Sequence, residues 1–149
     1  MKERLTVTLK NFSIHEADCQ CGCGKITSPE LMLRLQAFLY ILERIYVCPL
    51  RCLITGGARC NAHQKDIYGG KKVESYHCGI HRGRQVDPEG LAVDVVVEIN
   101  PIGDGWARVS KHTLAKLAIE SKLFGGVGWQ VYGPATQFVH LDLGAVRTF

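Results

Sequence analysis

Three polar side chains interrupt apolar stretches of the sequence, and their types match a metal site. His77 follows a Gly-rich segment, Asp94 interrupts an apolar run, and His140 lies in an alternating pattern. A buried carboxylate is costly unless it is paired or bound to a metal, so Asp94 needs a partner. Two histidines and one carboxylate form a common catalytic zinc set with a fourth position for water. The three residues therefore predict a zinc site; the alternative is an Asp94–arginine pair beside two ordinary histidines.

The surrounding pattern predicts a single α+β domain over residues 1–149 that positions these side chains. Ser28, Pro29 and Glu30 indicate the start of a helix of about 16–18 residues, because they suit the cap and first turn. Further elements are predicted along the chain: strands over Cys52–Thr55, Leu91–Glu98, Gly125–Trp129 and Gln137–Leu143, and a helix after Ser110. We expect the long segment between Gly57 and Gly90 to be a loop.

Composition narrows the class of protein. The chain has 149 residues and carries 18 Lys and Arg against 14 Asp and Glu, a net charge of +4. This mild excess is compatible with an anionic partner such as a cell wall but is not diagnostic. We expect no partner nucleic acid, because no clustered basic helix or stacking motif is evident. The most apolar stretch is interrupted by Glu43 and Arg44, so no membrane span is predicted.

The amino-terminal segment predicts where the chain is made. It has basic residues but no uninterrupted apolar region and no small-residue cleavage site, so no signal peptide is expected. We expect synthesis in the cytoplasm and action on the cell wall or periplasm only if the protein is released.

The chain contains seven cysteines: Cys19, Cys21, Cys23, Cys48, Cys52, Cys60 and Cys78. Without a secretion signal, reduced thiols are the default state. The segment Cys19-Gln-Cys21-Gly-Cys23 suggests a metal knot, but its spacing is shorter than the usual interval of about two to four residues. No second cluster follows at the distance typical of zinc ribbons. We therefore expect small buried thiols there, with metal binding as the alternative.

Three motifs in order resemble a known family: Ser75-x-His77, Gly90-x-Ala92-x-Asp94 and Phe138-Val139-His140-x-Asp142. They are similar to the zinc D-Ala-D-Ala carboxypeptidase / L-alanyl-D-glutamate endopeptidase family, which belongs with Hedgehog-like and lysostaphin-like zinc folds and includes many phage endolysins. The resemblance implies a small antiparallel sheet that carries the zinc, with helices packed on one side, and we expect a monomer. It also implies hydrolysis of a peptidoglycan stem peptide by a zinc-activated water.

The resemblance assigns roles to individual residues. His77, Asp94 and His140 would be the zinc ligands. Arg59, in the segment Ile54–Cys60, would hold the substrate carbonyl or oxyanion, and Ser75 would bind substrate near the metal. The alternatives are a salt bridge for Arg59 and a turn position for Ser75.

The spacing between the first two ligands departs from the family pattern. The family separates them by about seven residues, whereas His77 and Asp94 are seventeen apart here. Counting back strictly from Asp94 gives Asp87, and His81 is a rival imidazole inside the enlarged loop. We prefer His77, because Ser-x-His is intact there and a loop insertion between ligands is sterically easy.

The residue at the family's general-base position departs from the pattern as well. Many members carry an acid three residues before the last histidine, where this chain has Gln137, which cannot take a proton; we assign Gln137 to substrate binding. Asp142 lies on the strand face of His140 and is included in the catalytic set, although it could instead orient His140. Further candidates for the base lie on the loop: Glu89, Asp87 and His81.

Two rival functions remain open. A zinc-containing cell-wall binding module without turnover is favoured by Gln137. A thiol enzyme would use Cys60 or Cys78 with His63 or His81, and it requires a thiol whose pKa is depressed by its surroundings.

Overall fold

The alternating pattern of the longest strand gives the central sheet two different faces. The computed structural model describes residues 9–70, 75–81, 84–85 and 87–149, and its longest strand is β4 (Ala92–Ile99). Val93, Val95 and Val97 point into the hydrophobic core. Since successive side chains of a strand point to opposite faces, Asp94 lies on the face away from that core. Hydrophobic packing and polar chemistry are therefore separated by the sheet itself.

The main sheet has strand order β1-β4-β7-β6-β8, with β5 also paired to β4. The strand bounds are β1 Leu50–Gly56, β5 Ala107–Arg108, β6 Gly126–Gly128, β7 Val139–Asp142 and β8 Arg147–Thr148. All pairs are antiparallel except β6 with β8, so the sheet is mixed rather than the antiparallel sheet that we expected. A short turn reverses the chain between β7 and β8, and β7 is antiparallel to β6. It follows that β8 runs parallel to β6.

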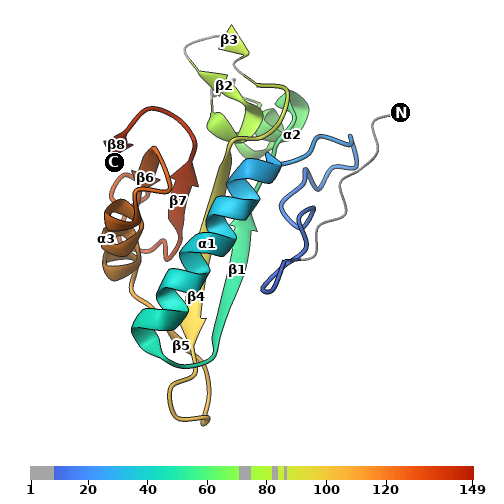
Figure 1. Ribbon diagram of the computed structural model, residues 1–149. Helices are drawn as coiled ribbons and strands as arrows, with labels where there is room; N and C mark the ends of the chain where they lie inside the picture. Colours follow the sequence, from blue (N-terminus) through green and yellow to red (C-terminus); the bar gives the residue numbers. More distant parts are fainter. Residues whose placement is uncertain (1–8, 71–74, 82–83, 86) are drawn as a thin grey trace.

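Two helices pack on the core face of the sheet (Figure 1). The first, α1 (Pro29–Tyr46), is capped by Ser28 as predicted, and the second, α3 (Lys111–Ser121), follows Ser110 as predicted. Phe38 of α1 meets Phe124 edge to face, with ring centroids 5.7 Å apart. No helix in the described part of the chain is long and apolar enough to cross a membrane.

The segment predicted to be a loop contains regular structure instead. Helix α2 (Asn61–Ile67), the 3₁₀ turn η1 (Tyr76–Cys78) and the small hairpin of β2 (Ile80–His81) and β3 (Arg84–Gln85) all lie within it. These elements are too short to produce a readable apolar period, so the loop prediction was wrong there. The hairpin accounts for much of the unusual distance in sequence between the two predicted ligands His77 and Asp94.

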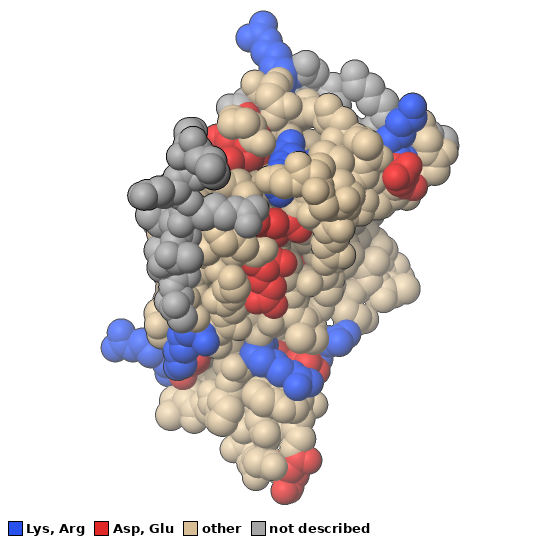
Figure 2. Space-filling model, turned by 90° about the vertical axis from the view of Figure 1, so that its right-hand side faces the viewer, with Lys and Arg blue, Asp and Glu red and all other residues tan. Residues whose placement is uncertain are grey.

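The charged side chains can be compared on one face of the molecule. On the face in Figure 2, acidic side chains gather near the centre, and Lys and Arg side chains are dispersed around them. The described Lys and Arg side chains visible on this face therefore do not form a single basic patch.

The stability of the fold should depend on the buried face of α1. Leu39 is fully buried, whereas Leu33 on the same helix is 47% exposed. Leu39→Ala should lower the free energy of unfolding by about 2–5 kcal/mol, because it removes buried methyl groups and leaves a cavity. Leu33→Ala is the matched control and should change it by less than about 0.5 kcal/mol. Urea unfolding followed by circular dichroism measures both, and equal losses would contradict the assigned faces.

Candidate metal centre

Asp94 and His140 are brought together by the pairing of β4 with β7. The two residues are direct cross-strand partners. His140 Nδ1 lies 3.0 Å from Asp94 Oδ1, and both side chains are buried. The neighbouring pairs Val93–Leu141 and Val95–Val139 belong to the core on the other face. Core packing of these neighbours thus fixes the pairing of β4 with β7, because a slip of one residue would turn every side chain of a strand to the opposite face. The same pairing places Asp94 beside His140.

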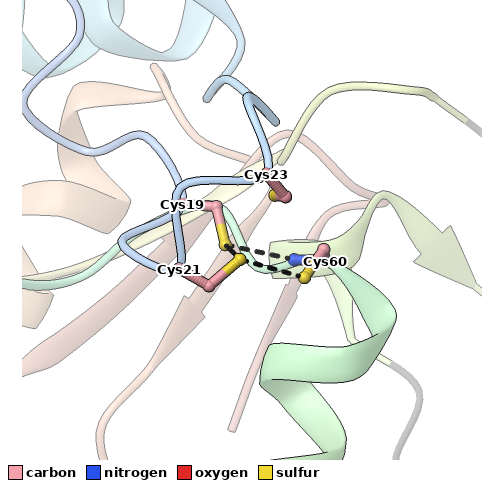
Figure 3. Close-up of side chains that lie close together, drawn as sticks. All are labelled: Cys19, Cys21, Cys23 and Cys60. Carbon is pink, nitrogen blue, oxygen red and sulfur yellow. Dashed lines mark hydrogen bonds between the residues drawn. The ribbon is translucent and has the colours of Figure 1, made fainter.

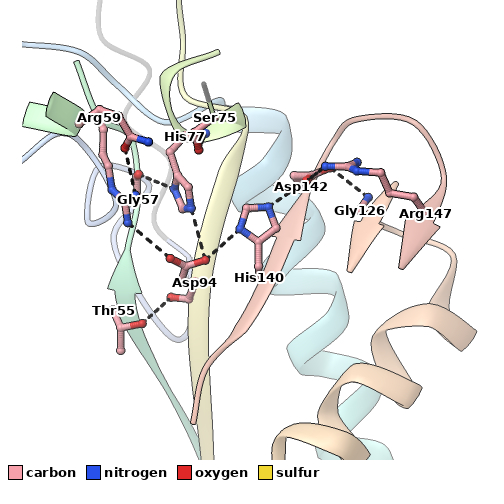
Figure 4. A network of polar contacts seen from close by, with 11 residues as sticks. Thr55, Gly57, Arg59, Ser75, His77, Asp94, Gly126, His140, Asp142 and Arg147 are labelled. Carbon is pink, nitrogen blue, oxygen red and sulfur yellow. Dashed lines mark hydrogen bonds and ion pairs between the residues drawn. The ribbon is translucent and has the colours of Figure 1, made fainter. Parts of the chain in front are cut away.

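His77 reaches the same point from outside the main sheet (Figure 4). Ser75 caps the η1 turn by accepting a hydrogen bond from the His77 backbone N–H at 3.1 Å. The His77 ring places Nδ1 2.7 Å from the Gly57 carbonyl and Nε2 3.3 Å from Asp94 Oδ1. A carbonyl can only accept, so Nδ1 carries a proton, and Nε2 is the ring nitrogen directed at Asp94 and free to bind a metal ion. We call His77, Asp94 and His140 the His–Asp–His centre.

The donor atoms of the His–Asp–His centre fit a small tetrahedral metal ion. All three side chains are buried, and their ligand atoms lie within 4.8 Å of one another. For bonds of about 2.0–2.1 Å to nitrogen or oxygen, the edge of a tetrahedron is about 3.3 Å. The distances from Asp94 Oδ1, 3.0 and 3.3 Å, are close to that edge. The structure therefore brings together the three residues that the sequence predicted as ligands, in a group that could bind a metal.

Behind His140 lies a second carboxylate, Asp142, which is fully buried. Asp142 Oδ2 is 2.9 Å from His140 Nε2 and accepts a hydrogen bond from Arg147 at 2.7 Å. Asp142 Oδ1 accepts from Arg147 and from the Gly126 backbone N–H. A Cβ at Gly126 would overlap the carboxylate, so this close approach requires glycine. Asp142 therefore contacts the His–Asp–His centre only through His140 Nε2, and its other partners lie on the side of His140 that faces away from Asp94.

Burial and hydrogen bonding act in opposite directions on the pKa values of these groups. Burial raises the pKa of Asp142, but hydrogen bonds from His140 and Arg147 outweigh it and bring the pKa to about 2. Asp94 is likewise held well below its usual pKa range, by His140 and His77 against the effect of burial. Burial lowers the pKa of His140, yet the two carboxylates raise it overall. A metal ion must displace a proton from this imidazole, so its affinity should fall as the pH falls.

Arg59 faces the outer oxygen of Asp94. Its Nη2 lies 3.5 Å from Asp94 Oδ2, and its Nη1 donates to Gln64 Oε1 at 3.1 Å. Gly56 leaves room for this pair, because a Cβ there would press on both side chains. The salt bridge that was the alternative for Arg59 is thus present. It leaves Asp94 Oδ1 directed at the two imidazoles.

A pocket of about 220 Å³ opens beside His140. Its lining includes Ser75, Tyr132, Phe149 and Arg147. The rings of Tyr132 and His140 are 6.2 Å apart, and burial raises the pKa of Tyr132, so its hydroxyl keeps its proton. Sequence analysis missed Tyr132, because it lies in an irregular segment without a motif. Ser75, predicted to bind substrate, lines the pocket and also serves as the turn cap.

The other predicted residues lie apart from the His–Asp–His centre or are only partly described. Gln137 is exposed in the segment before β7 and is not among the described residues that line the pocket. Asp87 accepts a hydrogen bond from the Glu89 backbone N–H at 2.8 Å, which caps the turn leading into β4. The side chain of His81 lies outside the described residues.

A second group of side chains that could hold a metal lies next to the Arg59 segment (Figure 3). It consists of Cys19, Cys21, Cys23 and Cys60, and we call it the four-cysteine cluster. The expectation of small buried thiols was wrong for Cys21 and Cys23, which are exposed. The fourth member, Cys60, comes singly from far along the sequence, so the cluster lacks the second group of cysteines that is typical of zinc ribbons.

The thiols proposed for a thiol enzyme have different surroundings. Cys78 is 1% exposed, and burial raises its pKa, which disfavours a reactive thiolate. The pKa of Cys60 is lowered to about 7, chiefly by the backbone N–H of His63. Cys60 is nevertheless within the four-cysteine cluster, and His63 Nδ1 lies 3.4 Å from Cys19 Sγ.

Comparisons with protein-family models, curated proteins and solved structures found no match for this chain. The family resemblance therefore rests on the ordered motifs around His77, Asp94 and His140. The chemistry of the two metal-binding groups is inferred from their own geometry.

Removing one ligand should empty the His–Asp–His centre. We expect His77→Ala to bind one metal ion fewer per chain than the unmodified protein, because two ligands cannot hold the ion tightly. His112→Ala, at an exposed histidine, is the matched control and should retain the full metal content. Elemental analysis after dialysis against zinc measures both. Full metal content in His77→Ala, with loss in His81→Ala instead, would show that the rival imidazole is the ligand.

Proposed function

We propose that the chain is a zinc-dependent peptidase that cleaves peptidoglycan stem peptides, of the D-Ala-D-Ala carboxypeptidase or L-Ala-D-Glu endopeptidase type. The observation that supports this most is the convergence of His77 Nε2, His140 Nδ1 and Asp94 Oδ1, next to a pocket that His140 lines. The ordered motifs add the substrate class by resemblance, and a Hedgehog-like or D-Ala-D-Ala-peptidase-like fold is part of the proposal.

The donor set suits catalytic zinc. Three protein ligands leave one position of a tetrahedron for water. Zinc bound there would lower the pKa of that water toward ~7 and polarise a substrate carbonyl. With His140 Nδ1 as the ligand atom, its Nε2–H donates to Asp142, and Arg147 holds that carboxylate in place. Such carboxylate–histidine pairs orient the ring and increase its basicity.

Asp142 is therefore proposed as a positioning residue rather than as the general base. Its carboxylate is fully buried, and both of its oxygens accept hydrogen bonds from groups behind His140. A general base must reach the proton that it removes, directly or through one water. Asp142 meets the structural requirement for orienting His140 and does not meet the requirement for a base.

Three other side chains have proposed roles near the His–Asp–His centre. Arg59 keeps Asp94 Oδ1 turned toward the imidazoles and adds positive charge where an oxyanion would form. Tyr132 offers a protonated hydroxyl from the pocket side. Ser75 fixes the turn that carries His77 and lines the same pocket. The proton acceptor is left unassigned, with Glu89, Asp87 and His81 as the candidates from the sequence.

A cell-wall binding module without turnover is the second candidate. The observation that favours it is Gln137, which occupies the position of the family's catalytic acid and is exposed before β7. This module would share the metal and the pocket but would release no product.

Digestion of purified peptidoglycan tests the proposed function. The zinc-loaded protein should release free D-Ala or expose new amino groups on stem peptides, detected by mass spectrometry of soluble fragments. Removal of zinc with a chelator and His140→Ala should each reduce the rate to background, whereas His112→Ala should retain it. Thiol alkylation of the zinc-loaded protein should leave activity intact, which distinguishes the zinc site from a thiol nucleophile. Tight binding to peptidoglycan without any cleavage would instead establish the binding module.

The Asp142 assignment makes a separate prediction. Asp142→Asn should weaken zinc binding about 10–100-fold, because the amide no longer fixes the His140 ring, and activity should recover when zinc is raised. Asp104→Asn, at an exposed position, is the control and should have no effect. Zinc titrations combined with the peptidoglycan assay measure both quantities. Normal zinc affinity together with a large loss of rate at saturating zinc would show that Asp142 is the base.

A further inference from the structure

We propose that the four-cysteine cluster (Cys19, Cys21, Cys23 and Cys60) binds one zinc ion through four thiolates, as a structural site separate from the His–Asp–His centre. Four protein ligands close the coordination shell and leave no position for water, which is typical of structural rather than catalytic zinc. The site would tie the amino-terminal loop to the segment that carries Arg59.

The sulfur positions match a four-thiolate metal site. The Sγ atoms of Cys19 and Cys21, and those of Cys21 and Cys60, are 3.4 Å apart, and all four lie within 4.8 Å of one another. Zn–S bonds of about 2.3 Å give a tetrahedral edge of about 3.8 Å, which lies inside this range. A disulfide would require sulfurs about 2.05 Å apart, and all seven cysteines are free. In Figure 3 the four side chains gather where the amino-terminal loop meets the start of α2.

The backbone around the cluster is arranged to turn sharply and to donate hydrogen bonds to sulfur. Gly22 and Gly24 have φ values of +81° and +84°, which non-glycine residues rarely adopt, so the loop can present three cysteines to one point. The backbone N–H of Lys25 donates to Cys23 Sγ and that of His63 donates to Cys60 Sγ, both at 3.4 Å. Such donors stabilise thiolates, the form that binds metal.

The cluster is open to ions from solvent yet anchored in the fold. Cys21 and Cys23 are exposed, whereas Cys19 is buried and accepts a hydrogen bond from the Cys60 backbone N–H at 3.5 Å. Between the two segments, the Ala58 N–H donates to the Ala17 carbonyl at 2.8 Å. A metal ion would therefore close a junction that the backbone has already aligned.

This junction leads directly to the His–Asp–His centre. Cys60 follows Arg59, whose backbone N–H donates to the His77 carbonyl at 2.9 Å and whose guanidinium faces Asp94. Gly57, three residues before Cys60, supplies the carbonyl that orients the His77 ring. Fixing Cys60 therefore fixes two contacts of the His–Asp–His centre. We expect loss of the four-cysteine metal to weaken metal binding at that centre as well.

Cobalt substitution in the His77→Ala variant tests the site independently of any activity. One Co²⁺ per chain should bind with the strong sulfur-to-metal charge-transfer absorption of a four-thiolate site. Adding Cys23→Ser or Cys60→Ser should weaken or abolish this absorption, whereas adding Cys48→Ser, outside the cluster, should leave it unchanged. Cys23 is exposed, so its variant keeps the test valid if Cys60→Ser does not fold.

Two results would overturn the proposal. One is cobalt binding without sulfur charge transfer in the His77→Ala variant under reducing conditions. The other is reaction of Cys21 and Cys23 with a thiol reagent at the same rate with and without zinc. Neither outcome decides the proposed peptidase activity, because each reports only whether the four cysteines bind a metal, and the His–Asp–His centre has its own three ligands.

Discussion

The buried carboxylate of Asp94 is the constraint around which this structure is organised. An unpaired charge in the sheet would be strongly destabilising, so the fold must surround it with donors or a metal. The chain provides His77 and His140 at one oxygen and Arg59 at the other. These partners come from three different segments, and each has its own support: the capped turn of His77, the strand pair of His140, and the contacts of Arg59 with Gln64 and the His77 carbonyl. The contacts between these segments and Asp94 thereby offset the unfavourable free energy of burying its carboxylate.

The sheet makes this arrangement compatible with a stable core. Hydrophobic residues of β4 and β7 pack under α1 and α3, and the same alternation directs Asp94, His140 and Asp142 to the other face. The packing that stabilises the fold also sets the register of the polar residues. A second layer, formed by Asp142 and Arg147, then determines which nitrogen of His140 faces Asp94. Stability and site geometry are coupled through one strand pair.

The regular spacing of apolar residues is what made most of the helices and strands predictable from the sequence. The strands around Asp94 and His140 and the helix capped by Ser28 could be predicted, because apolar residues recur along them at regular intervals. Helix α2 and the β2–β3 hairpin could not, since two to seven residues are too few to establish a period. Contacts between residues far apart in the sequence could not be predicted either, because no sequence pattern indicates that Cys60 lies near Cys19 or that Tyr132 lies near His140. Those proximities arise from the tertiary fold, through the turn of the amino-terminal loop and the approach of the segment before β7.

The most direct measurement is anomalous diffraction at the zinc absorption edge from crystals of the zinc-loaded protein. The account predicts a peak about 2.0–2.1 Å from His77 Nε2, His140 Nδ1 and an Asp94 oxygen. A second peak should lie about 2.3 Å from the four sulfurs of the four-cysteine cluster. Crystals that contain zinc but show no peak between His77, Asp94 and His140 would contradict the central claim that these residues form a metal centre.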